Sequence, residues 1–533
     1  MASQFTTTMN MVASKLLQLD LTSNAWAHQL LPRLQSRRGA VCGVLGAVVI
    51  YQLLSVLLAA PGQFKAINRG KEFALILTGV SGPERRRKEV IPLLAKGEPA
   101  YFSSERGVYT LYVAEPKMAR TILMRTGTFP HDMLGAMPKG SIFDKLVGTP
   151  SIVNSNGHIW KTHRKIASPA FRKSMPLQLF GKATLELFEE FKKANYKVDS
   201  SDYMERFTLD VIGRAAFDMT LNVMMTVFNA INLATAKFDP LLYRLSAKRR
   251  QAHADLDTFL STIDDVIAKK RATLSSDIAR SDEEDAEKDL LTMILEANND
   301  EGDDGQKLTD EEVKSNIITF FVAGHETTSN ALNFAMYHLS QNPTWSKLHP
   351  TGRIFKTKQE QKMTIAIMGD EPRDIIPTNE QLQKLRYINQ NIQEVLRLDP
   401  SALATTSRET LEDTEVGGRV ITKGTKVTLD VWSLHHNPCV WEDPERFNPD
   451  RFAPEGEFEK LDNFAYLPFS HGSRQCIGMN FSLAEQRVFL LMFLRKFEVK
   501  LAPNNIHKDG LIYNDKLLAN GCDHMLIELK PRY

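Results

Sequence analysis

Hydrophobic and polar positions divide the chain into one unbroken apolar run and a long body of mixed pattern. Residues 41–60 read VCGVLGAVVIYQLLSVLLAA and contain no charged side chain. A helix of about 20 residues spans the hydrocarbon thickness of a bilayer, which is roughly 30 Å. The pattern therefore predicts a transmembrane anchor at 41–60, after an N-terminal segment (1–40) and before one large body (61–533). A buried core helix is the alternative interpretation.

Helical spacing dominates the body, and short strand-like runs interrupt it. Residues 107–113 are rich in Val and Tyr and predict a strand, whereas helical spacing begins at Pro116 and recurs over 177–219 and 251–272. The segment GGRVITKGTKVTLD (417–430) suggests a hairpin that bends at Lys423-Gly424. These patterns predict a mainly α fold with small β-sheets, of the α+β class.

One predicted helix is unusually long and apolar on nearly every side. Thr309 and Glu312 have capping-box spacing, and helical spacing continues to Gln341, where Asn342-Pro343 ends it. Such a helix of about 30 residues is roughly 45 Å long and can cross a whole domain. Its middle carries Gly-His-Glu-Thr-Thr, and polar groups inside a buried helix cost free energy unless they have partners. We therefore expect this polar set to be functional.

Charge and cysteine content exclude several classes of protein. Lys plus Arg number 66 and Asp plus Glu number 64, a net charge of +2. This balance does not suit a nucleic-acid binder that neutralises phosphates. The four cysteines lie too far apart for a CxxC metal site or redox pair, so each needs its own explanation. The default for a free cysteine is a small buried hydrophobic residue.

Cys476 lies in the most specific motif of the chain. Residues 469–478 read FSHGSRQCIG, which has the form FxxGxRxCxG. Glycines beside a cysteine let backbone amides approach the sulfur and stabilise a thiolate. The segment resembles the cysteine-ligand loop of the cytochrome P450 family of haem-thiolate monooxygenases. The resemblance implies that Cys476 is the axial ligand of a haem b iron, with Phe469, Arg474 and Gly478 in the cofactor-binding loop.

A second motif lies in the middle of the long helix. Residues 323–328 read AGHETT, which is similar to the oxygen-activation motif AGxETT of the same family. Gly324 removes side-chain bulk and permits a local kink, and Glu326 with Thr327 forms an acid–alcohol pair that can relay protons through water. The alternative is a harmless helix in which the threonine hydroxyls bond to the preceding turn.

Two further sets of residues follow from the resemblance. It implies that Trp160, Arg164 and Arg408 hold haem propionates together with Arg474. It also implies a structural triad of Glu394 and Arg397, from the ExxR motif, with Arg446 of the PERF segment 444–447. Residues three apart share one helix face, which allows Glu394 and Arg397 to pair. Taken alone, ExxR would be a surface ion pair and each arginine a solvated charge.

The resemblance implies a monooxygenase that oxidises a lipophilic molecule with O2. Because the chain has no GxGxxG fingerprint after a predicted strand, NADPH-derived electrons are expected from a separate partner. That partner would be NADPH–cytochrome P450 reductase, with cytochrome b5 as a second donor, and it would dock on a basic face. The residues of that face are Lys161, Lys165, Arg172 and Lys173.

Location and two alternative functions complete the expectations. By analogy the anchor lies in the endoplasmic reticulum membrane and the catalytic domain (61–533) faces the cytosol. A haem-thiolate isomerase or dehydratase that needs no O2 is one alternative. A catalytically silent haem- or lipid-binding membrane protein is the other, because segment 349–370 lacks the amphipathic helix expected there and reads as an insertion or a sequence error. The substrate itself is not encoded in any recognisable pattern.

Overall fold

The computed structural model describes residues 63–104, 108–132, 138–147, 150–173, 175–217, 238–275, 289–299, 307–341, 364–515 and 519–533. The predicted anchor at 41–60 and most of the unusual segment 349–370 lie outside these residues. Within the described part of the chain, none of the helices has the length and apolarity needed to cross a membrane.

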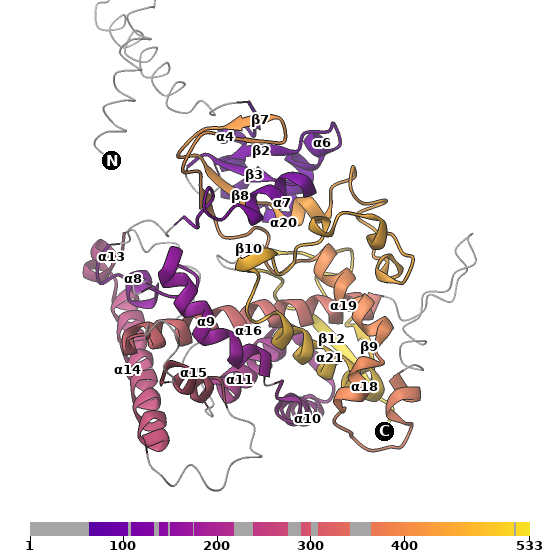
Figure 1. The fold of residues 1–533 in the computed structure, drawn as a ribbon. Helices are drawn as coiled ribbons and strands as arrows, with labels where there is room; N and C mark the ends of the chain where they lie inside the picture. The colour runs from indigo at the N-terminus through magenta and orange to yellow at the C-terminus, as the bar shows by residue number, and fades with distance from the viewer. Residues whose placement is uncertain are drawn as a thin grey trace, which may run out of the picture.

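A sheet-rich unit forms one end of the molecule (Figure 1). Its five strands lie in the order β1-β2-β3-β8-β5, with β2–β3 antiparallel and β3–β8 parallel. The strands are β1 (Lys65–Ala66), β2 (Ala100–Ser103), β3 (Thr110–Val113), β8 (Lys426–Leu429) and β5 (Arg408–Glu409). The sheet packs with its own hydrophobic core, separate from that of the helices. Strand β3 confirms the strand predicted near 107–113.

Short helices surround this sheet. They are α4 (Arg69–Leu77), α5 (Gly82–Glu89), α6 (Ile91–Leu94), α7 (Pro116–Met124) and α20 (Val431–His435). Helix α7 begins at Pro116, as predicted, because proline has no N–H to lose at the first helical position. The Glu115 side chain accepts a hydrogen bond from the amide of Met118 and closes that end.

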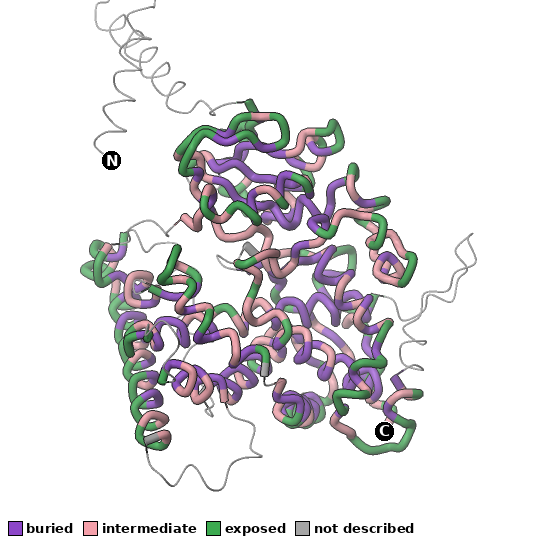
Figure 2. Tube along the Cα trace, viewed as in Figure 1, coloured by how far each residue is buried: buried purple, intermediate pink, exposed green. Residues whose placement is uncertain are grey.

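The larger unit is helical and has a second core of aromatic and aliphatic side chains. Its helices before the long central one are α8 (Ile142–Val147), α9 (Gly157–Lys173), α10 (Leu177–Lys193), α11 (Ser200–Phe217), α13 (Asp239–Leu245), α14 (Ala247–Ser275) and α15 (Leu290–Asn299). The central and later helices are α16 (Asp310–Gln341), a turn at 364–368, α18 (Asn379–Gln383), α19 (Arg386–Leu398) and α21 (Met479–Lys496). Figure 2 shows the buried residues gathered on the inner sides of these helices.

Small sheets and single turns complete the fold. Strands β4 (Lys197–Asp199), β12 (Leu526–Pro531) and β9 (Phe497–Leu501) form one antiparallel sheet, and β10 (Asn514–Asp515) pairs with β11 (Asn520–Gly521). Four 3-10 turns follow α20: η4 (Pro449–Phe452), η5 (Phe458–Lys460), η6 (Asn463–Ala465) and η7 (Gly472–Arg474). The mainly α architecture with small sheets agrees with the predicted class.

Helix α16 crosses the middle of the helical unit (Figure 1). The predicted capping box is present, because the Thr309 amide donates to Glu312 Oε2 at 2.9 Å and the Glu312 amide donates to Thr309 Oγ1 at 3.2 Å. Helix α11 packs along α16. The predicted span therefore matches the observed helix closely.

The hairpin predicted at Lys423-Gly424 is wrong. Strand β7 (Arg419–Ile421) pairs instead with β6 (Thr414–Val416), through a two-residue turn at Gly417-Gly418. Both glycines have positive φ, +61° and +75°, which two-residue hairpin turns need and which glycine adopts without strain. The chain turns again at Gly424, but β8 then joins the five-stranded sheet.

Candidate functional site

The loop before α21 holds Cys476 by backbone contacts. The Cys476 amide donates to the Phe469 carbonyl at 3.0 Å, which closes the loop at both ends of the motif. Gly472 has a φ of +75°, so a residue with a side chain would be strained there. Gly478 is the residue just before α21, and no side-chain group caps that helix.

The Cys476 thiol is accessible from one side and enclosed by protein on the others. Desolvation raises the pKa of the thiol, and this effect is opposed by the amides of Gly478 and Met479 and by the charge of Arg164. Amide N–H groups and a nearby cation are the features that stabilise a thiolate. The sequence-predicted Gly478 and Arg164 thus lie where they act on the sulfur.

Arg474 lies between the cysteine loop and the segment before α9. Its guanidinium donates to the carbonyl of Ser155 at 2.8 Å and to Asn156 Oδ1 at 2.9 Å, and it covers the Trp160 ring at 4.1 Å. Burial, with the charges of Arg408 and Arg164, lowers the pKa of Arg474 to about 10. Arg164 in turn donates to the carbonyl of Gln475 at 3.0 Å.

Arg408 is the most deeply buried cation of this group. Its side chain is 2% exposed and donates through one terminal nitrogen to the Phe129 carbonyl at 2.8 Å, while its Nε has no hydrogen-bond partner. Burial lowers the pKa of Arg408 to about 10. Burial also lowers the pKa of neighbouring His131 to about 3, aided by the charges of Arg474 and Arg408. A buried guanidinium without a counter-charge is costly.

Among the described residues, Arg164, Arg408 and Arg474 form no ion pair with a carboxylate. Buried charges in proteins are normally paired, so this arginine cluster (Arg164, Arg408 and Arg474) fits an anionic ligand. The orphaned Nε of Arg408, the accessible Cys476 thiol and the Trp160 ring fit a haem with two propionates. The structure therefore brings the predicted Cys476, Arg474, Trp160, Arg164, Arg408, Phe469 and Gly478 into one region.

Helix α16 is accessible at its middle although most of its length is buried. Ala323 is exposed and Glu326 and Thr327 are partly exposed, whereas residues 328–340 are buried. Thr327 Oγ1 donates to the Ala323 carbonyl at 2.8 Å, and Ser401 donates to the Thr327 carbonyl at 2.7 Å. The threonine bond to the preceding turn is thus present, and it lies on the accessible face.

Gly324 lies on the side of α16 that faces α11. The helix runs through it without a break, and a Cβ at this position would meet the Ile212 side chain of α11 at 3.4 Å. This distance is an ordinary van der Waals contact, so the packing of α11 on α16 would tolerate a Cβ here. Ala323, one position earlier, lies on the accessible face with Thr327, since residues four apart share a helix face.

A hydroxyl pair connects the two motif-bearing helices. Thr328 Oγ1 and Ser482 Oγ lie 2.9 Å apart, and Ser482 belongs to the first turns of α21, directly after the cysteine loop. His325 is buried and its Nδ1 bonds to the Phe321 carbonyl at 3.0 Å, which satisfies it within the helix.

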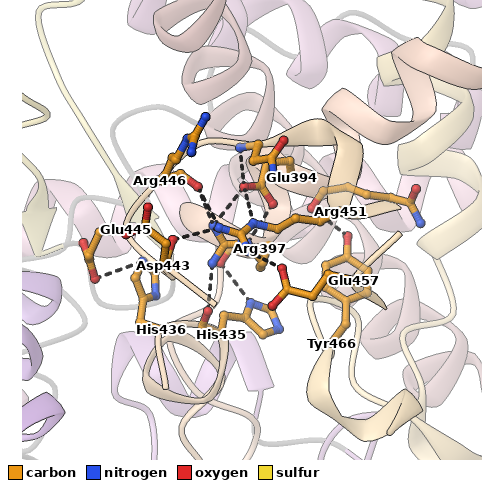
Figure 3. Close-up of polar contacts among 12 residues, drawn as sticks. Glu394, Arg397, His435, His436, Asp443, Glu445, Arg446, Arg451, Glu457 and Tyr466 are labelled. Atoms are coloured by element: carbon orange, nitrogen blue, oxygen red, sulfur yellow. Dashed lines mark hydrogen bonds and ion pairs between the residues drawn. The ribbon is translucent and has the colours of Figure 1, made fainter. Parts of the chain in front are cut away.

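Glu394 and Arg397 form a fully buried ion pair (Figure 3). Arg397 Nε donates to Glu394 Oε2 at 2.7 Å, and both side chains are 0% exposed. Burial alone would lower the pKa of Arg397, but Glu394 raises it above its ordinary value. His435 contributes its carbonyl to Arg397 at 2.9 Å and its Nδ1 donates to the Arg397 carbonyl.

The third member of this network, after Glu394 and Arg397, is Arg451, where the sequence predicted Arg446. Arg451 Nε lies 3.4 Å from Glu394 Oε1, and the same guanidinium pairs with Glu457. Arg446 contributes its backbone carbonyl to Arg397, at 3.3 Å (Figure 3). The sequence PERFNPDRF holds two similar segments in tandem, and the second one places its arginine at the buried position. The repeat was the signal that could have identified Arg451.

The family comparison agrees with this geometry. The family model described as Cytochrome P450 matches residues 93–519, so the chain belongs to the cytochrome P450 family, a class of haem-thiolate monooxygenases. A solved structure titled cytochrome P450DA heme domain matches with a TM-score of 0.69 at 23% identity, covering 86% of this chain and 95% of that one. That likeness confirms the fold.

Several characterised relatives share the family. LUTEIN DEFICIENT 5, a chloroplastic protein of Arabidopsis thaliana, is 28% identical over 74% of this chain and 66% of its own length. The 11-oxo-beta-amyrin 30-oxidase of Glycyrrhiza uralensis is 27% identical, over 76% of each chain. A bifunctional cytochrome P450/NADPH–P450 reductase of Bacillus cereus is 32% identical over 64% of this chain, which spans 31% of that relative.

Proposed function

We propose that this protein is a haem-dependent monooxygenase that oxidises a lipophilic small molecule with O2 and electrons from a reductase. One observation carries the proposal: Cys476 is exposed and lies near Arg164, which belongs to a cluster with Arg408 and Arg474 that has no carboxylate partner among the described residues. A thiolate ligand and anionic side groups are what haem brings together in this family.

The residues of the chain divide the work of holding the cofactor. Cys476 would supply the thiolate that holds the haem, and the amides of Gly478 and Met479 would moderate its electron donation. Arg408, Arg474 and Arg164 hold the propionates, and Trp160 supports Arg474 through its ring face. When bound, haem with a thiolate ligand supplies the reductive activation of O2.

Thr327 and Glu326 manage protons at the accessible part of α16. The proton of Thr327 is engaged with the Ala323 carbonyl, so its oxygen accepts a hydrogen bond from a water or a reactant on that face. Glu326, the adjacent residue, is partly exposed and delivers protons through water. Gly324 keeps side-chain bulk off this part of the helix.

NADPH–cytochrome P450 reductase is the proposed electron donor, with cytochrome b5 as a second one. The Bacillus relatives are bifunctional cytochrome P450/NADPH–P450 reductases. In this chain, Lys161, Arg164, Lys165 and Arg172 line one pocket on the outer face of α9, and acidic residues are absent from its lining. This basic face suits an acidic partner and lies on the same helix as Trp160.

Membrane attachment rests on the apolar run at 41–60 and on two exposed apolar groups. Phe73 and Leu77 of α4 are 60% and 70% exposed, and Phe238 and Leu245 at α13 are 65% and 74% exposed. Such surface apolar groups are typical of sites that contact lipid or another protein. We propose a single-pass anchor in the endoplasmic reticulum, with the catalytic domain in the cytosol.

Isotopically labelled O2 provides the direct test. The full chain, loaded with haem, is combined with reductase, NADPH and a library of lipophilic compounds, and products are analysed by mass spectrometry. The proposal predicts an NADPH-dependent product that carries one labelled oxygen atom. A product without labelled oxygen would instead indicate an isomerase or dehydratase, and failure to bind haem would indicate the silent protein.

The proton role of Thr327 has its own test. Thr327→Ala should keep the haem spectrum but divert consumed O2 from product to peroxide, lowering the product formed per NADPH by about tenfold or more. Thr319→Ala is the matched control, because Thr319 makes the same bond to its preceding turn, at 2.8 Å, elsewhere on α16. Equal coupling in the two variants would contradict the assignment.

A further inference from the structure

A polar pocket of about 420 Å³ lies apart from the cysteine site, where α9 ends and α10, α18, α19 and α21 meet. Its polar lining consists of Arg172, Arg487, Asn379, Gln383, Asn389 and Asn480, and no Asp or Glu lines it. The volume lies within the usual range for small-molecule sites. Two guanidinium groups and four amides, without an acid, are an unusual lining for a pocket without a ligand.

A hydrogen bond holds the Arg487 side chain in place, but no carboxylate neutralises its charge within the described residues. Its Nε donates to Asn389 Oδ1 at 2.6 Å, which fixes the guanidinium, and the structure shows no ion pair for Arg487 within the described ranges. Desolvation lowers the pKa of Arg487. Arg172, which is exposed at the end of α9, likewise has no ion pair there. The pocket thus holds two positive charges with open donors.

Two helix starts border the pocket. Helix α10 begins at Leu177, which lines the pocket, and its N-cap Pro176 provides no side-chain hydrogen bond. Helix α21 begins at Met479 and is also without a side-chain cap, and its second residue, Asn480, lines the pocket. The Leu177 amide donates to the Met175 carbonyl at 2.7 Å, and the Met479 amide is directed to the Cys476 sulfur. The two guanidinium groups therefore supply the main attraction for an anion in the pocket.

We propose that this pocket binds a small phosphate-bearing anion, held by Arg487 and Arg172 and by the amide side chains around them. Arginine matches the geometry of phosphate oxygens through paired N–H donors, and asparagine and glutamine amides complete the donor set. The site shares none of its residues with the cysteine loop or the arginine cluster, and it shares Arg172 with the proposed reductase-docking face of α9. It is therefore a ligand site in addition to the proposed oxygenase centre.

Titration calorimetry of the full chain with inorganic phosphate tests the proposal, at constant ionic strength set with chloride and without reductase or substrate. Saturable binding of one phosphate is expected. Arg487→Gln should weaken it by about 10- to 100-fold, since hydrogen bonds to charged groups are strong. Lys165→Gln is the matched control, because it removes the same charge from the neighbouring face of α9 and should leave the affinity within about twofold.

A second variant keeps the test valid if Arg487→Gln does not fold. Asn480 is exposed, so Asn480→Asp should fold normally and place a carboxylate against the anion, which would abolish phosphate binding. Glycerol 3-phosphate and vesicles of phosphatidic acid distinguish a soluble ligand from a lipid headgroup. No saturable binding, unchanged binding in both variants, or equal weakening by Lys165→Gln would overturn the proposal. Since none of these measurements uses turnover, the outcome is independent of the monooxygenase assignment.

Discussion

Two groups of arginines in this protein, one buried and one partly buried, differ in what neutralises them. In the first, Arg397 and Arg451 meet Glu394 and Glu457, and every charge has a counter-charge from the chain (Figure 3). In the second, the arginine cluster of Arg164, Arg408 and Arg474 meets carbonyls and an aromatic ring, with no carboxylate among the described residues.

The difference separates a structural role from a ligand-binding role. Burying a charge costs several kcal/mol unless a partner compensates it. The Glu394 network is complete within the polypeptide, so it serves the fold. The arginine cluster keeps an uncompensated cost in the polypeptide alone, and an anionic ligand removes that cost when it binds. Arginine therefore stabilises the fold in the first group and binds a ligand in the second.

The largest expected effect comes from breaking the paired network. Arg451→Ala leaves Glu457 without its guanidinium and removes one of the two guanidinium groups at Glu394, so it should lower the free energy of unfolding by about 3–5 kcal/mol. Arg446→Ala should change it by about 1 kcal/mol or less, because the carbonyl that Arg397 contacts is kept. Chemical denaturation of the two variants measures the difference. Similar losses would mean that Arg446, as the sequence predicted, is the third member.

The arginine cluster should respond in the opposite way. Arg408→Met removes an unpaired buried cation, so the haem-free protein should be as stable as the wild type or more stable. The same variant should bind haem about tenfold more weakly or worse, because charge-assisted hydrogen bonds to the propionates are lost. Thermal melts without haem and haem titration measure the two effects. A destabilised haem-free variant with unchanged haem affinity would assign Arg408 to the fold.

A smaller effect is expected in the pH dependence of stability. His435 is buried beside Arg397, and burial with that charge lowers its pKa from 6.5 to about 3. Its Nε2 accepts the Leu467 amide at 2.9 Å, so protonation would break this bond. Between these pH values His435 binds a proton in the unfolded chain but not in the folded one. The free energy of unfolding should therefore fall as the pH drops from about 6.5 towards 3.

His435→Gln isolates this contribution. The free energy of unfolding of the variant should be lower at neutral pH. It should also fall less steeply as the pH decreases, and the difference in slope from the wild type should correspond to about one proton. Denaturation curves at several pH values give both slopes. Parallel slopes would show that His435 is already charged in the folded protein.

Strong local signals allowed much of the fold to be predicted. The capping box at Thr309 and Glu312 and the absence of proline up to Gln341 predicted α16, and Pro116 marked the start of α7. The stretch 177–219 was harder, because helical spacing continues across the short strand β4, which pairs with the distant β12. The prediction of a hairpin at Lys423-Gly424 was wrong for a similar reason, because β8 pairs with β3, which is distant in the sequence.

The candidate site shows the same limit. Cys476 and its glycines lie in one contiguous loop, so spacing alone identified them. The choice between Arg446 and Arg451 depended on which copy of a tandem segment reaches Glu394, which only packing decides. His131 carried no signal, because its proximity to Arg408 and Arg474 arises from the meeting of three separate segments.

The central claim is that the Cys476 sulfur binds haem iron beside a cluster of arginines that hold the propionates. The most direct measurement is the absorption spectrum of the haem-loaded protein, reduced and exposed to carbon monoxide, compared with that of Cys476→Ser. The account predicts the long-wavelength Soret band of thiolate ligation in the wild type and its loss in the variant. A wild-type spectrum typical of nitrogen ligation, or one that is unchanged by the substitution, would contradict it.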